Sequence, residues 1–334
     1  MKKIAFVTNS ATHCGIHQYG RAVHRVLSAS DKFEYEFTPT IHEFHERDKI
    51  DKRIWTRWLV NMDCDAILYN HCHNTMNWLD EEVVAHVNHK GKPQFLITGH
   101  DIFSTIPGIT HHFVTNPTFE NTVTHSALLR PLLLDHELFY EPPSETIKIG
   151  TFGLAYTSKN LPLLVRYVNE SFPSTQKVEL NIHATVGKYV LGSRQHVDRA
   201  IQTCRAFAAG NVTVNFTTEF IESLDEVIVM LHNNDINVFL YSDEPNRFAV
   251  SSALDLALSA RKPVAISDSS MFAHARHVED IVVDIMELQY STGKQINWLP
   301  DIMKLGMKPL YELYENWAPS RFCAVIENKL QESI

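Results

Sequence analysis

The motif Gly99-His100-Asp101 comes directly after an apolar run at residues 95–98. A histidine ring changes charge near neutral pH, so it can exchange a proton or a hydrogen bond with a substrate. An aspartate can orient or charge-stabilise such a ring. We therefore predict that His100 and Asp101 are catalytic residues. The chain has 19 histidines, most of which must serve the surface or the core, so the position of His100 after a strand carries this prediction.

A second polar motif, His71-Cys72-His73-Asn74, follows the apolar run at residues 66–69. Open α/β sheets bind ligands just beyond the carboxyl ends of their strands, so this motif is well placed for a site. The His-X-His spacing also occurs in metal sites. No clear carboxylate set accompanies it, so we predict no metal. A metallohydrolase built on His71, His73 and His100 is the alternative.

A glycine loop precedes the first helix that the sequence predicts. Apolar residues from Ile16 to Leu27 recur at the helical period, and Gly15 stands at the start of this pattern. The free backbone N–H groups of a helix start can bind an anion or a sugar. Only Gly15 and Gly20 occur here, so the dinucleotide fingerprint is absent and an NAD enzyme is disfavoured. A plain tight turn at Gly15 is the alternative.

The second half repeats this design with a lysine. An apolar run at residues 147–152 leads into Gly153 and then Lys159, just ahead of another helical pattern. A lysine at the positive end of a helix dipole is mildly unfavourable unless an anion lies nearby. The position of Lys159 therefore favours phosphate binding. The alternative is an ordinary solvated lysine.

Two serines precede the apolar helix at residues 253–258. Ser251 and Ser252 are good N-cap residues, and the N–H groups of the first helical turn are suited to binding a diphosphate. Asp255 lies one turn into the helix, within reach of a ribose hydroxyl. The sequence predicts a donor site for a nucleotide at this helix.

Strand-like runs alternate with helical patterns through both halves, which predicts parallel sheets. Prolines and acids at residues 140–145 suit an exposed linker. We place a domain boundary there, with one domain at residues 1–143 and another at 144–315. The strand-like runs are residues 4–8, 66–69, 95–98 and 113–115, and then 147–152, 178–183, 212–216, 236–241 and 263–267.

The composition limits the partners and the compartment that we expect for this protein. The 334 residues carry a formal net charge of −9, which disfavours a nucleic-acid partner without excluding a local basic groove. Five widely spaced cysteines without a CxxC motif suit a reducing compartment, and no signal peptide or membrane-spanning run is evident. We therefore expect a cytoplasmic protein without a transmembrane segment.

Taken together, these motifs resemble the retaining glycosyltransferases of family 4. The Gly15 loop, the His100-Asp101 strand end, residues 153–159 and residues 251–264 carry the resemblance, which spans nearly the whole chain. Residues 315–322, with Trp317, are similar to the family's closing segment. The resemblance implies an α/β GT-B fold, in which two Rossmann-like domains have parallel sheets facing across a cleft. It places the acceptor on residues 1–143, the nucleotide-sugar donor on 144–315, and a helix at 316–334 that crosses back to the first domain.

The resemblance also implies roles for particular residues. His100 would lie beside the transferred sugar, Lys159 would neutralise the donor diphosphate, and residues 249–252, Val250 among them, would hold phosphate through backbone amides. Such sites use lysine and helix dipoles in place of a metal ion, and need no cofactor beyond the donor. His71, His73 and Asn74 are candidates for acceptor contacts.

The sequence departs from the family at two glutamates eight positions apart, which correspond to Phe248 and Leu256. Glu244 and Asp255 are near substitutes. The family's arginine ahead of the lysine is also missing, and Arg247 is a candidate replacement.

We therefore predict a metal-independent glycosyltransferase, and the resemblance implies retention of anomeric configuration. The residues themselves leave the donor, the acceptor, the anomeric outcome and the oligomeric state open. The alternative is a non-catalytic nucleotide-sugar-binding protein or partner subunit on the same scaffold. An epimerase or hydrolase would need a pair of carboxylates, which the sequence does not provide.

Overall fold

The computed structural model describes residues 1–100, 103–135, 144–188, 192–243, 248–285 and 298–334. Residue contacts divide the chain into two compact units. Unit 1 is Met1–Pro131, Asn246–Val250 and Trp317–Ile334, and unit 2 is Leu132–Pro245 and Ser251–Asn316. The change of unit thus comes after Pro131, twelve residues before the boundary expected from sequence, and most of the expected linker lies outside the described residues.

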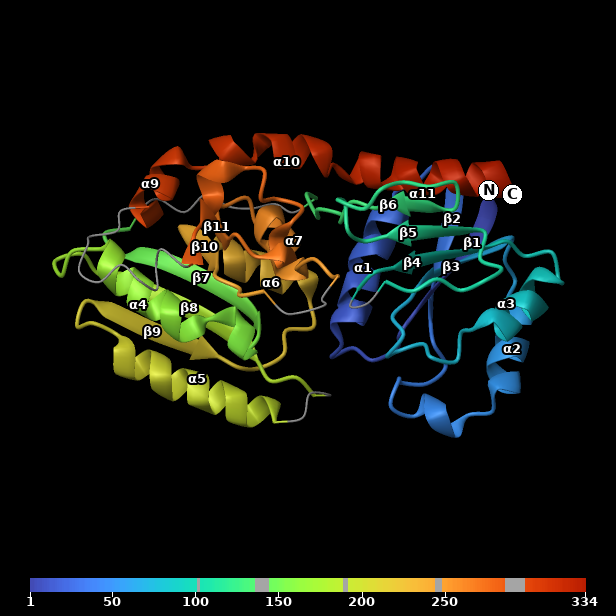
Figure 1. Ribbon diagram of the computed structural model, residues 1–334, viewed down its shortest axis with the longest axis horizontal. Helices are drawn as coiled ribbons and strands as arrows, with labels where there is room; N and C mark the ends of the chain where they lie inside the picture. Colours follow the sequence, from blue (N-terminus) through green and yellow to red (C-terminus); the bar gives the residue numbers. More distant parts are fainter. Residues whose placement is uncertain (101–102, 136–143, 189–191, 244–247, 286–297) are drawn as a thin grey trace. The chain divides into compact units, whose positions relative to one another are not determined.

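Unit 1 contains a six-stranded sheet in the order β2-β1-β3-β4-β5-β6, and every strand pairing is parallel (Figure 1). β1, β3, β4 and β5 are buried along most of their length, as expected for a parallel sheet with helices on both faces. The strands are β1 (Lys2–Thr8), β2 (Phe33–Pro39), β3 (Ala66–Asn70), β4 (Gln94–Thr98), β5 (His111–Val114) and β6 (His125–Ala127).

Two pairs of helices cover this sheet. One face packs against α2 (Lys52–Val60) and α3 (Glu81–Asn88), which meet the sheet in a shared apolar cluster. Both helices begin at an aspartate side chain that accepts a backbone N–H bond. The other face packs against α1 (Gly15–Leu27), which contacts α11 (Pro319–Ser333).

The C-terminal helix is fastened to unit 1 by polar contacts as well as by packing. Glu327 on α11 is buried, accepts a hydrogen bond from Ser30 and lies 3.3 Å from the ammonium of Lys32. The thiol of Cys323 donates to the carbonyl of Val26 at 3.4 Å. The grouping of residues 317–334 with unit 1 rests on contacts of this kind.

Unit 2 contains a second six-stranded parallel sheet, in the order β12-β11-β10-β7-β8-β9. Counted from β7, this is the strand order of a Rossmann unit. The strands are β7 (Ile147–Leu154), β8 (Val178–Thr185), β9 (Val212–Thr217), β10 (Ile236–Phe239), β11 (Val264–Ser267) and β12 (Val282–Val283).

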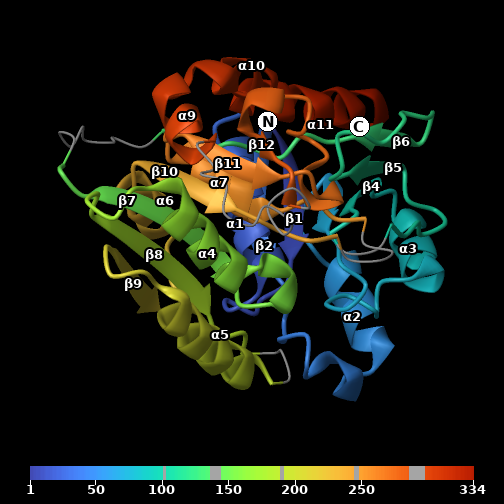
Figure 2. The same cartoon turned by 60° about the vertical axis from the view of Figure 1, so that its left-hand side comes forward.

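The helices of unit 2 also form two layers (Figure 2). A large apolar cluster joins one face of the sheet to α4 (Leu161–Ser171), α5 (Ser193–Phe207) and α9 (Trp298–Leu305). On the other face, α6 (Leu224–His232) packs against α7 (Ser252–Ser259). Short elements complete the described chain: η1 (Arg47–Lys49), η2 (Thr157–Lys159), η3 (Ser270–Phe272), η4 (Glu279–Ile281), η5 (Lys308–Leu310) and α10 (Tyr311–Asn316).

The two parallel sheets confirm the α/β prediction, and each of the nine strand-like runs overlaps a strand of the structure. The sequence analysis missed β2, β6 and β12, each of which is an edge strand of its sheet. Because all pairings are parallel, the carboxyl ends of the strands in each unit meet at one edge, where loops carry the predicted site residues. Among the described residues, no helix is long and apolar enough to span a membrane.

Candidate functional site

Asn70 is the centre of a hydrogen-bond network at the carboxyl edge of the unit 1 sheet. Its side-chain nitrogen donates to the carbonyl of Ile16 at 2.7 Å and to the hydroxyl of Thr8 at 2.9 Å. Its side-chain oxygen lies 2.8 Å from Nε2 of His100. Asn70 and Thr8 are completely buried, and His100 is 8% exposed. The network therefore joins the end of β1, the start of α1, the end of β3 and the loop after β4.

A buried arginine stands next to this network. The guanidinium of Arg130 lies 4.4 Å from the ring centre of Tyr19, whose ring meets the His100 ring edge-on at 4.9 Å. Arg130 is only 3% exposed. Burial lowers the pKa of His100 well below its usual range, and the charge of Arg130 and the ring of His71 lower it further. His100 is therefore a neutral imidazole at pH 7.

The other predicted residues of unit 1 have different surroundings. His71 is 2% exposed, and burial, with smaller contributions from His73 and His112, lowers its pKa to about 4. Among the described residues, no group donates to or accepts from its Nδ1 atom. His73 and Asn74 are exposed, so only part of this motif is available to a ligand. Asp101 lies outside the described residues.

Gly15 is the first residue of α1 and is exposed. A Cβ atom added to it would meet no atom within 4 Å. Packing within unit 1 therefore does not demand a glycine here, unlike at Gly20, where an added Cβ would lie 2.5 Å from the Thr8 hydroxyl and 2.8 Å from the amide nitrogen of Asn70.

Phe248 belongs to unit 1 by its contacts. Its ring lies 5.7 Å from Phe103 and 6.3 Å from Phe119, and its carbonyl accepts a bond from Asn116 at 3.2 Å. A Cβ on Gly99, whose φ is +94°, would lie 3.2 Å from the Phe248 ring. The position that the resemblance assigns to a glutamate is thus filled by a ring packed among aromatic residues.

In unit 2, Lys159 is held at the carboxyl edge of the sheet by two neighbours. It ends the short helix η2 that follows β7, and its ammonium lies 3.5 Å from the ring centre of Tyr241, just after β10. Gly153 has a φ of +136°, and a Cβ there would lie 3.3 Å from the same ammonium. Only a glycine lets the backbone approach the ammonium this closely without strain.

The helix α7 begins where the sequence predicted, although its cap differs from the prediction. Ser251 occupies the N-cap position with extended backbone, yet its hydroxyl caps no N–H group of α7, and its own N–H donates to the Met271 carbonyl at 2.8 Å. Ser252 is the first helical residue and is exposed, whereas Val250 is 5% exposed.

Asp255 is 6% exposed, and its Oδ1 atom lies 3.6 Å from Nε2 of the buried His274. Its contact with a ribose hydroxyl stays a prediction, and Arg247 lies outside the described residues.

Asp243 fastens two loops at this edge of unit 2. Its Oδ1 atom accepts bonds from the Ser270 N–H at 2.6 Å, the Ser270 hydroxyl at 2.8 Å and the Ser269 hydroxyl at 2.9 Å. These bonds, led by that of the Ser270 N–H, lower the pKa of Asp243. The carboxylate thus ties the loop after β10 to the loop after β11.

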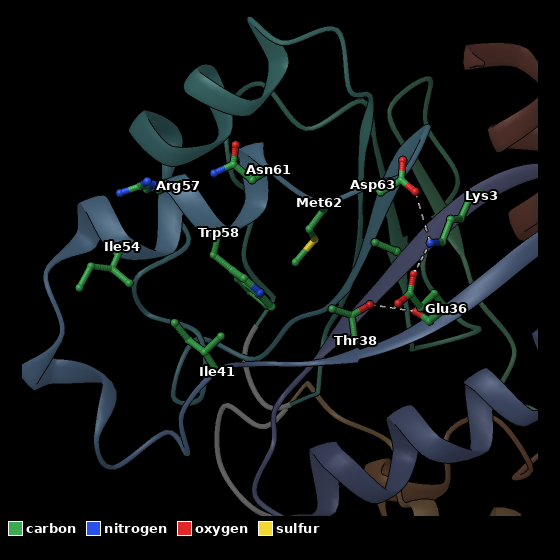
Figure 3. Close-up of a pocket in the computed structure, with 11 residues that line it drawn as sticks. Lys3, Glu36, Thr38, Ile41, Ile54, Arg57, Trp58, Asn61, Met62 and Asp63 are labelled. Carbon is green, nitrogen blue, oxygen red and sulfur yellow. Dashed lines mark hydrogen bonds and ion pairs between the residues drawn. The ribbon is translucent and has the colours of Figure 1, made fainter.

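Unit 1 also has an open pocket of about 620 Å³ between α2, the edge strand β2 and the neighbouring strand β1 (Figure 3). Trp58 and Met62 line its interior, and Ile41 and Ile54 are exposed at 40% and 52%. Lys3 bridges Glu36 and Asp63 at one end, at 2.8 and 3.9 Å. No group of three or more histidine, cysteine or acidic residues with the arrangement of a metal site occurs in the described part of the chain.

Neither a protein-family model nor a curated protein sequence matches the chain, whereas solved structures match it over nearly its whole length. The sucrose-phosphate synthase of Thermosynechococcus elongatus has a TM-score of 0.65 at 11% identity and covers 99% of each chain. HepE of Anabaena, in complex with UDP-glucose, has a TM-score of 0.64 at 11% identity and covers 99% of this chain and 100% of its own. A glycosyltransferase from Rickettsia africae has a TM-score of 0.64 at 8% identity, with 99% and 98% covered.

The chain has the GT-B fold.

Within this GT-B fold, the sequence predicted His100 and Lys159 as site residues, but it did not predict the side chains that contact them. Asn70 ends the apolar run of β3 immediately before the predicted His71 motif, and a buried amide at a strand end was the available signal. Nothing in the spacing pointed to Arg130 or Tyr241, because both reach their partners only through tertiary packing.

Proposed function

We propose that this chain is a glycosyltransferase that takes a sugar from a nucleoside-diphosphate sugar, and that unit 2 binds the donor. The observation that carries this proposal is the ammonium of Lys159, held against Gly153 and Tyr241 at the carboxyl edge of a Rossmann-ordered sheet. Ligands of open α/β sheets bind at this edge, and a fixed cation stabilises the charge that grows on a leaving diphosphate.

The start of α7 is the second element of the proposed donor site. The hydroxyl of Ser251 does not cap the first turn, so the backbone N–H groups there are suited to an oxyanion from outside the chain. A helix start and a lysine together supply positive potential without a metal ion. We therefore propose a metal-independent reaction, and retention of anomeric configuration follows only from the resemblance to family 4.

For unit 1, we propose that His100 hydrogen-bonds a hydroxyl of a sugar substrate. The imidazole is neutral, rigidly held through Asn70 and slightly exposed. A group that is already oriented before the substrate arrives loses little entropy on binding. His73 and Asn74 are exposed residues near the same strand end and remain candidates for acceptor contacts.

The first experiment is a thermal-shift and calorimetric panel of nucleoside diphosphates and nucleotide sugars, because a ligand that binds only the folded state raises its stability. UDP and UDP-glucose come first in the panel, since HepE was solved with UDP-glucose. One nucleotide should raise the melting temperature and bind stoichiometrically. No binding across the panel would contradict the proposal.

A pair of lysine variants locates the site. Lys159→Ala should weaken nucleoside-diphosphate binding by about 1.5 to 3 kcal/mol, the usual contribution of a charge-assisted contact. Lys177→Ala removes the same charge from an exposed position just before β8, at the other end of the unit 2 sheet, and should leave affinity unchanged. Equal affinities of both variants and the unmodified protein would make Lys159 a surface lysine.

One observation favours the alternative of a non-catalytic nucleotide-sugar-binding protein. The two family glutamates are replaced by Phe248 and Leu256, and the Phe248 ring is packed against Phe103 and Phe119, where a carboxylate would be desolvated. This alternative predicts donor binding without turnover. Slow donor hydrolysis measured in the absence of acceptor distinguishes the two, because only the enzyme releases free sugar.

A further inference from the structure

The orientation of the Asn70 amide is set by its partners. The carbonyl of Ile16 can only accept a hydrogen bond, so the side-chain atom 2.7 Å from it must be the NH₂ group. The same nitrogen donates to Thr8. The amide oxygen therefore faces His100, and the usual ambiguity between the two ends of an asparagine amide is resolved by geometry.

This orientation determines which nitrogen of His100 carries the proton. The amide oxygen of Asn70 has no hydrogen, so the 2.8 Å contact exists only if Nε2 of His100 donates. We propose that Asn70 is a positioning residue that fixes His100 in the tautomer protonated at Nε2, and that Nδ1 is a hydrogen-bond acceptor for a substrate hydroxyl. Within the described part of the chain, no residue forms a hydrogen bond with Nδ1 of His100.

The surroundings of the ring keep it in this neutral form. His100 is buried against Tyr19, and the guanidinium of Arg130, 4.4 Å from the centre of the Tyr19 ring, opposes a second positive charge. The pKa of His100 is lowered by burial first and by Arg130 second. A protonated ring would donate from both nitrogens, whereas the neutral ring accepts at Nδ1.

The tautomer selects the chemistry of the group that His100 contacts. An acceptor nitrogen pairs with a hydroxyl and cannot hydrogen-bond a phosphate, a carboxylate or a carbonyl oxygen, each of which lacks a proton to give. The identity of that hydroxyl, as one belonging to a sugar, rests on the proposed function. The tautomer itself does not rest on it, because every contact that fixes it lies within unit 1.

The test reads the two ring nitrogens of His100 directly by long-range ¹H–¹⁵N NMR of the ligand-free full chain with ¹⁵N-labelled histidine. The spectrum of His100→Gln identifies the His100 signals by their loss. We expect a pyrrole-like shift at Nε2 and a pyridine-like shift at Nδ1 at pH 7. A pyrrole-like Nδ1, or a doubly protonated ring, would overturn the proposal.

Substitutions at Asn70 then test its role. Asn70→Leu removes the acceptor, so the strong preference for the Nε2–H form should be lost. Asn70→Asp keeps an acceptor and adds a negative charge, so the same tautomer should persist while the pKa of His100 rises. The matched control is Gln94→Leu, which removes another buried amide of unit 1, at the opposite end of the sheet. An unchanged His100 spectrum in both Asn70 variants would overturn the positioning role.

Kinetics with the nucleotide sugar found in the panel complete the test. If Asn70 acts by positioning His100, Asn70→Leu should lower kcat by roughly 10-fold or more with little change in donor KM, because the affected contact is made at the sugar in the transition state. If no nucleotide or nucleotide sugar in the panel binds, the proposed function is contradicted, but the tautomer result is unaffected. If a donor binds but His100 is protonated at Nδ1, only the inference about Asn70 and His100 is contradicted.

Discussion

Both units bring an asparagine amide against a glycine of the backbone, but they do so at different ends of their sheets. In unit 1, a Cβ on Gly20 would lie 2.8 Å from the amide nitrogen of Asn70 at the carboxyl edge. In unit 2, a Cβ on Gly150 would lie 2.2 Å from the amide nitrogen of Asn234 and 2.4 Å from the amide oxygen of Asn237, near the start of β10.

The amides of unit 2 form a chain of hydrogen bonds that ends on a helix. Asn215 donates to Asn181, Asn181 to Asn234, Asn234 to Asn237, and Asn237 to the carbonyl of Leu231 on α6. These bonds fasten α6 to the sheet and reach no predicted site residue. The same kind of amide contact therefore reaches a predicted site residue only at the carboxyl edge, where Asn70 contacts His100.

Acidification should destabilise unit 1 much more than unit 2, and this is the largest difference that we expect between the two units. Burial lowers the pKa of five described histidines in unit 1 (His71, His100, His111, His112 and His125) and of one in unit 2, His183. For His71, between its ordinary pKa of 6.5 and its folded value of about 4, the unfolded chain binds a proton that the folded chain does not, so stability falls as pH drops. His71 alone should cost unit 1 roughly 2 to 3 kcal/mol at pH 4.5.

Hydrogen exchange measured by mass spectrometry at pH 7 and pH 4.5, corrected for the intrinsic rates, resolves the two units in one experiment. Core amides of β3 and β4 should lose more protection than those of β7 and β8. His71→Gln should recover part of the loss. Equal losses in both units would show that the buried histidines do not set the acid stability of unit 1.

Removing the ring that Asn70 orients should give the largest effect on turnover. His100→Ala should lower kcat by about 100-fold or more while nucleotide affinity stays nearly unchanged, as expected of a group that acts at the sugar. His89→Ala is the control, because it removes an exposed histidine after α3 that is outside the proposed site, and it should leave kcat unchanged. Steady-state kinetics on the donor found in the panel decide this, and unchanged turnover would remove His100 from the site.

Crowding the asparagine chain of unit 2 should affect stability alone. Gly150→Ala forces a methyl group onto the buried amides of Asn234 and Asn237, which should lower the free energy of unfolding by about 1 to 3 kcal/mol. Gly210→Ala adds a methyl group where no atom lies within 4 Å and serves as the control. Urea denaturation measures the difference. A change in the His100 NMR signals of Gly150→Ala would show that the asparagine chain of unit 2 also affects His100, contrary to this prediction.

Crowding the network of unit 1 should have a smaller effect on stability and a specific effect on the site. Gly20→Ala should cost about 1 to 2 kcal/mol, since Thr8 and Asn70 can yield in part. It should also shift the His100 ring signals, because Asn70 must move away from the added methyl group. Unchanged signals in a destabilised protein would mean that Asn70 does not control the histidine.

The sequence predicted the sheets well because buried parallel strands are continuous apolar runs, as in β3 and β4. It missed β2, where Phe33, Tyr35 and Phe37 alternate with polar residues in the two-residue period of an edge strand. That alternation was a readable signal. The very short β6 and β12 gave none, because three and two residues cannot show a period.

The sequence could indicate which strand ends carry candidate site residues, but it could not indicate the contacts that hold those residues. His100 and Lys159 were predicted as site residues because each follows a strand, and the structure places both just beyond the carboxyl end of that strand. The contacts that hold them depend on which distant segments pack together, such as Tyr19 with Arg130 and Lys159 with Tyr241, and no local pattern encodes such pairs. The N-cap role of Ser251 was half right, since the residue is at the cap position and its hydroxyl makes no capping bond.

We propose that a nucleoside-diphosphate sugar binds at the carboxyl edge of unit 2 through Lys159 and the start of α7. Hydrogen exchange with and without a saturating nucleoside diphosphate tests it most directly, because backbone N–H groups that bind phosphate become protected. We predict protection at residues 153–160 and 251–255, and its loss in Lys159→Ala at the same ligand concentration. Protection confined to other segments, or protection in unit 2 that survives Lys159→Ala unchanged, would contradict the account.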